Sequence, residues 1–172
     1  MASATLGLAT AHLALGRNAP ARTSADEAVV LLEAVLEQDR GLQWRAVLGA
    51  ALLRRGQARL AMGDPAGSAA DWRRAVATFQ AMPPRDPEAA FLEACCHAML
   101  AGAAGQIGSS LPPDAGSIEA GRAIDILRQA VAIGFRSARR YRIEPALAPL
   151  RDRDDFHLLI MDLAMPDRPF AP

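Results

Sequence analysis

The apolar residues of this chain recur at intervals of three and four, which is the period of an α-helix with one buried face. After Gly63, for example, a single stripe contains Ala69, Trp72, Ala75, Val76 and Phe79. No stretch of useful length alternates apolar and polar residues, as a half-buried β-strand would. The pattern therefore predicts an all-α fold.

Glycine and Asp-Pro pairs indicate where several of these helices begin and end. Gly16 and Gly63 each follow an apolar stripe, and glycine readily adopts the left-handed conformation that ends a helix. Asp64-Pro65 and Asp86-Pro87 predict helix starts, because the Asp side chain caps the first turn and Pro needs no hydrogen-bond partner there.

Three further positions set the expected boundaries. Ser24 lies three residues before Glu27, the spacing of a capping box, so a helix is expected to start there after a loop that contains Asn18 and Pro20. Pro83-Pro84 is expected to end the fourth helix, because Pro cannot continue a helix. The last helix is expected to begin near Asp154 and to be stopped by Pro166 and Pro169.

The predicted helices pair into three hairpins and a cap within one domain, residues 1–172. The hairpins are expected at about 2–38, 42–81 and 86–134, with a loop rich in Gly, Ser and Pro at 102–116 inside the third. A cap at 137–165 and a tail at 166–172 complete the chain. A chain of 172 residues can bury a core of its own.

Charge and composition then narrow the classes of function. The 19 basic and 19 acidic residues cancel, so the chain has no strong electrostatic attraction to nucleic acid or anionic lipid. Every basic residue is an arginine, which excludes the catalytic and phosphate-binding lysines of kinases and Walker-type sites. No apolar run reaches the roughly 20 residues that span a bilayer, so we expect no membrane partner. Met1–Gly16 lacks the basic start of a signal peptide.

Cys95, Cys96 and His97 are the strongest candidates for a metal ligand or a nucleophile. Consecutive residues of a helix point in different directions, and metal sites need ligands at wider spacing plus a second pair elsewhere. Two buried, reduced thiols are therefore favoured, and these indicate a cytoplasmic protein. His12 and His157 lie far away in sequence. We expect no catalytic residue, no metal and no cofactor.

Two charged clusters have competing explanations. Asp152, Asp154 and Asp155 could bind a metal, but they lie where a helix N-terminus favours negative charge, and this second explanation is preferred. The only basic run consists of Arg136, Arg139, Arg140 and Arg142. It could contact phosphate or RNA, or it could be a solvated face that pairs with nearby acids, which the zero net charge favours.

The stretch from Arg54 to Asp64, together with Trp72, resembles one tetratricopeptide repeat (TPR), a helical hairpin with a period of about 34 residues. In this resemblance Gly56 is the small residue where the two helices cross, and Trp72 is the aromatic plug of the second helix. Ser68 and Ala75 match small positions of that helix. Arg55 and Arg59 depart from the repeat, which prefers apolar residues there.

Residues 15–36 form a weaker copy of the repeat, and residues 91–99 with 123–131 form another, with a long loop inserted. The resemblance implies a right-handed α-solenoid of about three TPR-like hairpins. Some TPR proteins hold a peptide carboxylate with Lys, Asn and Arg. This chain has no Lys and a single Asn, Asn18, so that clamp is expected to be absent.

The last 50 residues resemble the C-terminal tail of large bacterial serine/threonine kinases that carry TPR arrays. The matching segments are Leu127–Phe135, Leu147–Phe156 and Asp162–Ala171. The resemblance implies the arm of such a kinase-like signalling protein and no kinase activity, because the catalytic His-Arg-Asp and Asp-Phe-Gly motifs are missing.

In the TPR family the first helix of each hairpin lines a concave surface that binds a peptide. Mapping that pattern onto this sequence gives a candidate groove of Leu53, Arg54, Gln57, Leu60, Phe91, Leu92, Cys95 and Met99. The first hairpin adds Leu6, Thr10 and Leu13. The same residues could instead pack between neighbouring repeats.

The sequence thus predicts a non-catalytic protein-protein interaction module whose partner is a protein or peptide segment. The alternative is a nucleic-acid-binding helical repeat that uses the four arginines of the basic run. The uncharged stretch Met1–Leu15 also predicts either an array that extends beyond it or self-association through the first helix.

Overall fold

The computed structural model describes residues 1–39, 41–82 and 86–165, in which every regular element is a helix. In chain order the elements are α1 (Ala2–Ala14), α2 (Asn18–Gln38), α3 (Leu42–Ala61), α4 (Pro65–Gln80), α5 (Pro87–Ala103), α6 (Ala115–Ala132), α7 (Ala138–Ile143), the 3-10 helix η1 (Pro145–Leu150) and α8 (Asp154–Ala164). The predicted all-α class is confirmed. Within the described residues, no helix is both long and apolar enough to cross a membrane.

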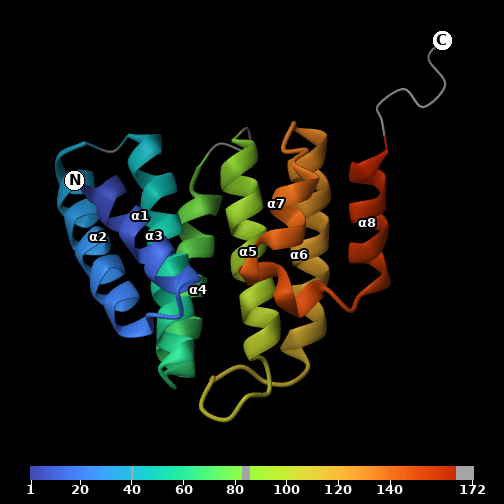
Figure 1. The fold of residues 1–172 in the computed structure, drawn as a ribbon, viewed down its shortest axis with the longest axis horizontal. Coiled ribbons are helices and arrows are strands. Elements are labelled where there is room, and N and C mark those ends of the chain that lie inside the picture. The colour runs from blue at the N-terminus through green and yellow to red at the C-terminus, as the bar shows by residue number, and fades with distance from the viewer. Residues whose placement is uncertain (40, 83–85, 166–172) are drawn as a thin grey trace.

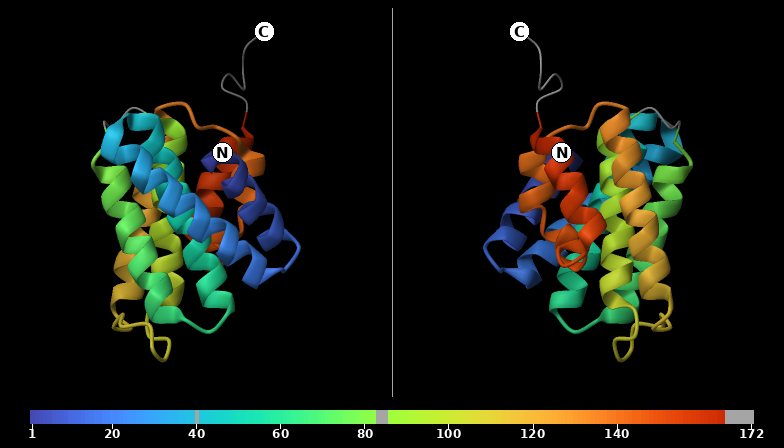
Figure 2. Two further views of the ribbon diagram at one scale, coloured as in Figure 1. Left: turned by 90° about the vertical axis from the view of Figure 1, so that its left-hand side faces the viewer. Right: turned by 90° about the vertical axis from the view of Figure 1, so that its right-hand side faces the viewer.

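Helices that follow one another in the chain pack side by side (Figure 1). Contacts join each helix from α1 to α6 to the next helix in the chain, and the expected pairs, α1 with α2, α3 with α4 and α5 with α6, are among these contacts. The first helices of these pairs also touch, α1 with α3 and α3 with α5. We call the surface that α1, α3 and α5 share the first-helix face. Figure 2 shows α1, α7 and α8 on one side of the molecule, and α4 and α6 on the other.

The predicted Asp-Pro and Gly boundaries are present. Asp64 Oδ1 accepts a hydrogen bond from the Gly67 backbone N–H at 2.8 Å as α4 begins. Asp86 likewise accepts from two backbone N–H groups at the start of α5. Gly63, which follows α3, has a φ of +82°, in the region that only glycine adopts without strain. The expected stops at Pro83-Pro84 and Pro166 lie outside the described residues, as does the tail at 166–172.

The predicted start of the second helix is wrong. We expected a loop through Asn18 and Pro20 and a cap at Ser24, whereas α2 already begins at Asn18 and Ser24 lies inside it. Pro20 is the third residue of α2, where backbone N–H groups have no partner within the helix, so the missing N–H of Pro costs no hydrogen bond there.

Gly56 of α3 lies directly against Trp72 of α4. A Cβ atom at Gly56 would lie 2.3 Å from Trp72 Nε1. The Trp72 side chain is fully buried, and its Nε1 donates a hydrogen bond to the Leu53 carbonyl at 3.3 Å. The structure therefore places Gly56 at the helix crossing and Trp72 as the buried aromatic residue, as expected. Ser68 and Ala75 are also buried.

The two arginines that depart from the TPR pattern share one buried partner, Asp71 of α4. Arg55 donates to both Asp71 carboxylate oxygens, at 2.9 and 2.6 Å. Arg59 Nη1 lies 3.0 Å from Asp71 Oδ2. Burial opposes the charge of Arg55, but the hydrogen bonds to Asp71 outweigh it and raise the pKa of that guanidinium. The polar residues in place of apolar ones thus join α3 to α4 through ion pairs.

The C-terminal part differs from the expected cap. Only α8 lies at the end of the row (Figure 1), whereas η1 packs against α5 and Tyr141 of α7 contacts Phe91 of α5. Tyr141, Leu147 and Leu150 of this segment are fully buried. A Cβ atom at Gly102 of α5 would lie 2.7 Å from Pro149 Cγ. We call residues 138–150 the fold-back segment, and its apolar side chains complete the core over α5.

Candidate peptide-binding face

A hollow of about 520 Å³ lies on the first-helix face, where α1, α3, α5 and the fold-back segment meet. Its lining comprises Thr10, Leu13, Ala14, Arg54, Gln57, Leu60, Ala61, Met99, Ile143, Glu144 and Pro145. Most of these side chains are apolar, and the polar groups of Thr10 and Gln57 lie among them. Such a surface can accept an apolar side chain and offer hydrogen bonds to the backbone beside it.

An ion pair closes one side of this hollow. Arg54 of α3 donates to the two carboxylate oxygens of Glu144, at 2.8 and 3.2 Å. Arg54 Nη1 also donates to Gln57 Oε1 at 2.8 Å. Burial disfavours both charges, yet the hydrogen bonds between them outweigh it. The pKa of Glu144 is lowered and that of Arg54 is raised. The pair is therefore ionised, and it fixes the fold-back segment to α3.

The structure brings half of the predicted groove residues to this hollow. Arg54, Gln57, Leu60 and Met99 line it, together with Thr10 and Leu13 from the first hairpin. The other four, Leu53, Phe91, Leu92 and Cys95, are buried in the core. Leu6 is partly buried and packs against the core.

Phe91 shows why these side chains are covered. Its ring stacks on Phe135 with centroids 4.5 Å apart and meets the edge of Tyr141 at 5.2 Å. The guanidinium of Arg140 lies over the Phe91 ring at 5.2 Å. Side chains from later parts of the same chain thus cover the apolar stripe of α5. Sequence reasoning missed Ile143, Glu144 and Pro145 as lining residues.

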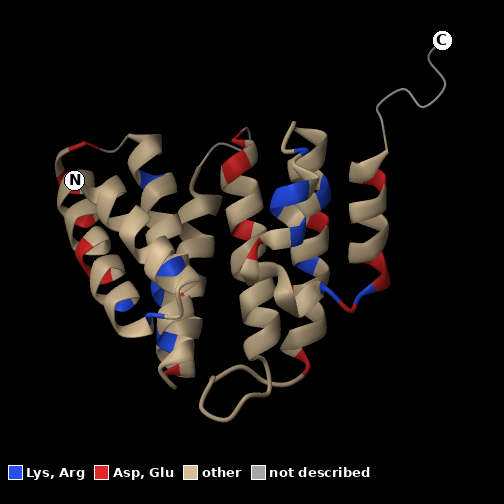
Figure 3. Cartoon of the chain, in the orientation of Figure 1, with Lys and Arg blue, Asp and Glu red and all other residues tan. Residues whose placement is uncertain are grey.

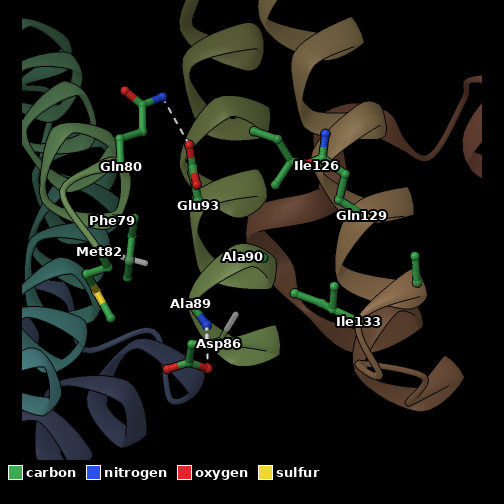
Figure 4. Close-up of a pocket in the computed structure, with 11 residues that line it drawn as sticks. Phe79, Gln80, Met82, Asp86, Ala89, Ala90, Glu93, Ile126, Gln129 and Ile133 are labelled. Atoms are coloured by element: carbon green, nitrogen blue, oxygen red, sulfur yellow. Dashed lines mark hydrogen bonds between the residues drawn. The ribbon is translucent and has the colours of Figure 1, made fainter. Parts of the chain in front are cut away.

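A second groove runs along the opposite side of α5, between α4 and α6 (Figure 4). Phe79 of α4 and Met82, which follows that helix, face Ile126 of α6 and Ile133 at the end of α6 across a hollow of about 490 Å³. Gln80 Nε2 donates to Glu93 Oε1 at 3.0 Å across it. The groove continues into a more polar hollow of about 600 Å³, which shares the residues Gln80 and Ile126. The sequence-based groove did not include these side chains, because that mapping covered only first helices.

The Cys95-Cys96-His97 cluster is built into the core. Both thiols are free and buried, and burial raises the pKa of each thiol. His97 pairs with Glu119 of α6 through Nδ1. Within the described residues, no group of three or more His, Cys, Asp or Glu side chains is arranged to hold a metal ion. His12 and His157 lie on different helices, α1 and α8.

The structure also shows where the acidic cluster and the basic run lie. Asp154 and Asp155 occupy the first turn of α8, where the helix dipole favours negative charge. A hydrogen bond from Arg153 lowers the pKa of Asp155. In the basic run, Arg140 donates to Glu88 at 2.9 Å in addition to its contact with Phe91. Arg139 and Arg142 are exposed on α7. Within the basic run, Arg140 therefore makes structural contacts, whereas Arg139 and Arg142 lie on the surface.

Comparison with known proteins assigns no family to this arrangement. No protein-family model, curated protein or solved structure matches the chain.

Proposed function

We propose that this chain is a non-catalytic, TPR-type protein-binding module that holds a peptide segment of another protein in the hollow on its first-helix face. The observation that carries the proposal is the convergence of three first helices on one apolar hollow. In TPR solenoids that surface is the peptide-binding surface.

Three features support a right-handed α-solenoid as the framework. The hairpins pack in chain order, and their first helices form a row. The crossing of Gly56 and Trp72 follows the TPR pattern within one hairpin. The second hairpin keeps this pattern although Arg55 and Arg59 replace apolar residues, because both guanidinium groups form ion pairs with the buried Asp71.

The ligand that fits best is an extended peptide with one large apolar side chain. The exposed residues Ala14 and Ala61 keep the entrance of the hollow open, since their side chains are small. The side-chain amide of Gln57 and the hydroxyl of Thr10 can bond to the peptide backbone. The charges of Arg54 and Glu144 neutralise each other, so no net charge is required of the ligand.

The proposal includes the setting that the C-terminal resemblance implies, namely the arm of a bacterial serine/threonine kinase-like protein in the cytoplasm. The two buried free thiols support a reducing compartment. The sequence upstream of the same reading frame tests the setting: kinase catalytic motifs there would support it, and a stop codon or an unrelated domain would contradict it.

A selection from random peptides displayed on phage tests the binding site. The immobilised chain is expected to enrich peptides with a shared apolar residue. An Ala61→Trp variant, which fills the hollow from an exposed position, is expected to weaken their binding roughly tenfold or more. Ala132→Trp is the matched control, because Ala132 is an exposed Ala in the α4–α6 groove.

Three results would contradict the proposal. In the first, the selection enriches no peptide. In the second, the Ala61→Trp variant binds the enriched peptides as tightly as the wild type does. In the third, the Ala61→Trp variant still binds them and the Ala132→Trp variant does not. The last would move the site to the α4–α6 groove. Circular dichroism of both variants checks that the helices are intact.

A further inference from the structure

The two ends of the molecule carry surfaces of opposite chemistry. At one end of the long axis lies α2, and at the other lies α8 with the adjoining fold-back segment (Figure 1). Acidic residues gather on α2 and basic residues around α7, as Figure 3 shows. Neither surface belongs to the peptide-binding hollow.

The surface at the α8 end is a hollow of about 530 Å³ with an apolar floor and a basic rim. It is lined by Arg142, Arg151, Phe156, His157, Ile160 and Met161. No acidic residue is among them, although α8 itself carries Asp154, Asp155 and Asp162. We call this hollow the basic hollow.

The arginines of the rim are available to a partner. The Arg151 side chain donates to the Arg142 carbonyl at 3.3 Å, and within the described residues no ion pair joins either guanidinium to a carboxylate. Met161 is 63% exposed, and Leu158 beside it is 57% exposed. An apolar surface of this kind next to unpaired charges is typical of a binding surface.

The surface at the α2 end has the complementary character. Val30 is 64% exposed and Leu31 is 36% exposed, with Glu27 and Glu37 on the same side of the helix. Residues 27, 30, 31, 34 and 37 form one stripe, because they are three or four positions apart. Neither Glu27 nor Glu37 takes part in an ion pair within the described residues. We call this stripe the acidic stripe.

We propose that the acidic stripe of α2 in one copy of this chain docks into the basic hollow of a second copy. Val30 and Leu31 would cover the apolar floor formed by Phe156, Ile160 and Met161. Glu27 and Glu37 would pair with the arginines of the rim. Because the two surfaces lie at opposite ends of the molecule, the contact is head-to-tail and can repeat from copy to copy.

Charge complementarity selects a second copy as the occupant. The α2 helix contains four acids and one arginine, and residues 136–151 contain five arginines and one acid, Glu144. That acid is already paired with Arg54. Opposite charges at two ends of one chain favour association of unlike ends and disfavour association of like ends.

Sedimentation velocity of the purified 172-residue chain tests this. The wild type is expected to form species larger than a dimer as its concentration rises, and added NaCl is expected to reverse the association, because salt screens exposed charges. Val30→Arg disables the acidic stripe, and Met161→Glu disables the basic hollow. The self-association of each variant alone is expected to be weakened roughly tenfold or more, so each remains monomeric at concentrations where the wild type associates.

A mixture of the two variants gives the decisive result. Val30→Arg keeps its basic hollow and Met161→Glu keeps its acidic stripe, so an equimolar mixture is expected to form a dimer and nothing larger. The two substituted surfaces can add at most one exposed ion pair between the new side chains, and such a pair contributes little to the free energy of association. Ile107→Arg, at a 99% exposed position on the loop between α5 and α6, is the matched control and is expected to assemble as the wild type does.

The proposal fails if the wild type remains monomeric up to high micromolar concentration, if either single variant still assembles, or if the mixture remains monomeric. Both substituted side chains are more than half exposed, so the variants are expected to fold, and circular dichroism checks this. Peptide binding in the first-helix hollow is measured separately, because neither substitution touches it.

Discussion

Arg54 and Glu144 are 90 residues apart in the chain, yet they form a two-point ion pair whose side chains are only 12% and 7% exposed. This pair joins α3 to the turn between α7 and η1. It links the N-terminal hairpins to the fold-back segment, and it forms part of the wall of the candidate binding site.

Removing the carboxylate of this pair is expected to destabilise the fold. Glu144→Gln leaves the buried Arg54 charge without a counter-charge, at a cost of about 3 kcal/mol in the free energy of unfolding at neutral pH. Urea unfolding measures this. Asp125→Asn is the control, because it removes an exposed pair with Arg128 and is expected to cost less than about 1 kcal/mol. Equal effects of the two substitutions would contradict the importance of the pair.

The same pair predicts a dependence of stability on pH. The pKa of Glu144 is lower in the folded state, so its contribution is complete above its ordinary value of 4.5 and is lost as the pH falls toward the folded pKa. Below about pH 4.5 the wild type is expected to lose stability faster than Glu144→Gln. Parallel stability curves for the two proteins in this range would show that Glu144 is not involved.

Two glycines on helices provide a matched test of the α3–α4 crossing. Gly56→Ala is expected to lower the unfolding free energy by about 2 kcal/mol, because the new Cβ overlaps Trp72. Gly121 of α6 has no atom within 4 Å of an added Cβ, so Gly121→Ala is expected to stabilise the chain by about 0.8 kcal/mol. Thermal unfolding of both variants gives the sign directly. A neutral Gly56→Ala would mean that the helices can separate there without cost.

The buried carboxylate of Asp71 predicts coupling between α3 and α4. Asp71→Leu leaves the arginines at 55 and 59 without their shared acid and is expected to cost about 3 kcal/mol. When Arg55→Leu is added, the double variant is expected to be less unstable than the two single losses combined, by about 1 kcal/mol or more. A double-mutant cycle in urea measures this, and strictly additive losses would exclude the coupling.

The two cysteines are expected to be inert in the folded chain. Because burial raises the pKa of both thiols, the reactive thiolate form is scarce. A chromogenic disulfide reagent at about pH 8 should react with them only as fast as the chain opens. Guanidinium should release both thiols at once. Rapid reaction of the native chain would contradict the buried positions of Cys95 and Cys96.

Much of the helix framework follows from the sequence, because its signals are local. The Asp caps before Pro65 and Pro87, the glycines after α1 and α3 and the crossing at Gly56 each depend on nearby residues. The start of α2 could not be predicted from the sequence. Pro20 is compatible with either a loop or the first turn of a helix, and only packing decides between the two.

The candidate site was only half predictable, for a physical reason. Periodicity shows that Leu53, Phe91, Leu92 and Cys95 lie on an apolar face, but a face that binds a ligand and a face that binds the rest of the chain have the same periodicity. The partner of that face is the fold-back segment, which begins 35 residues after Ala103, the end of α5. Neither helix propensity nor a repeat pattern encodes a contact at that separation.

The fold-back segment also has a consequence for the order in which the chain can reach its native state during synthesis. The apolar face of α5 is made early, but Tyr141, Leu147 and Leu150, which shield it from water, leave the ribosome about 50 residues later. Until then the nascent third hairpin exposes an apolar surface that other proteins can contact. A chaperone that recognises such surfaces is expected to bind ribosome-held chains ending before residue 138 and to release those extending well past residue 150.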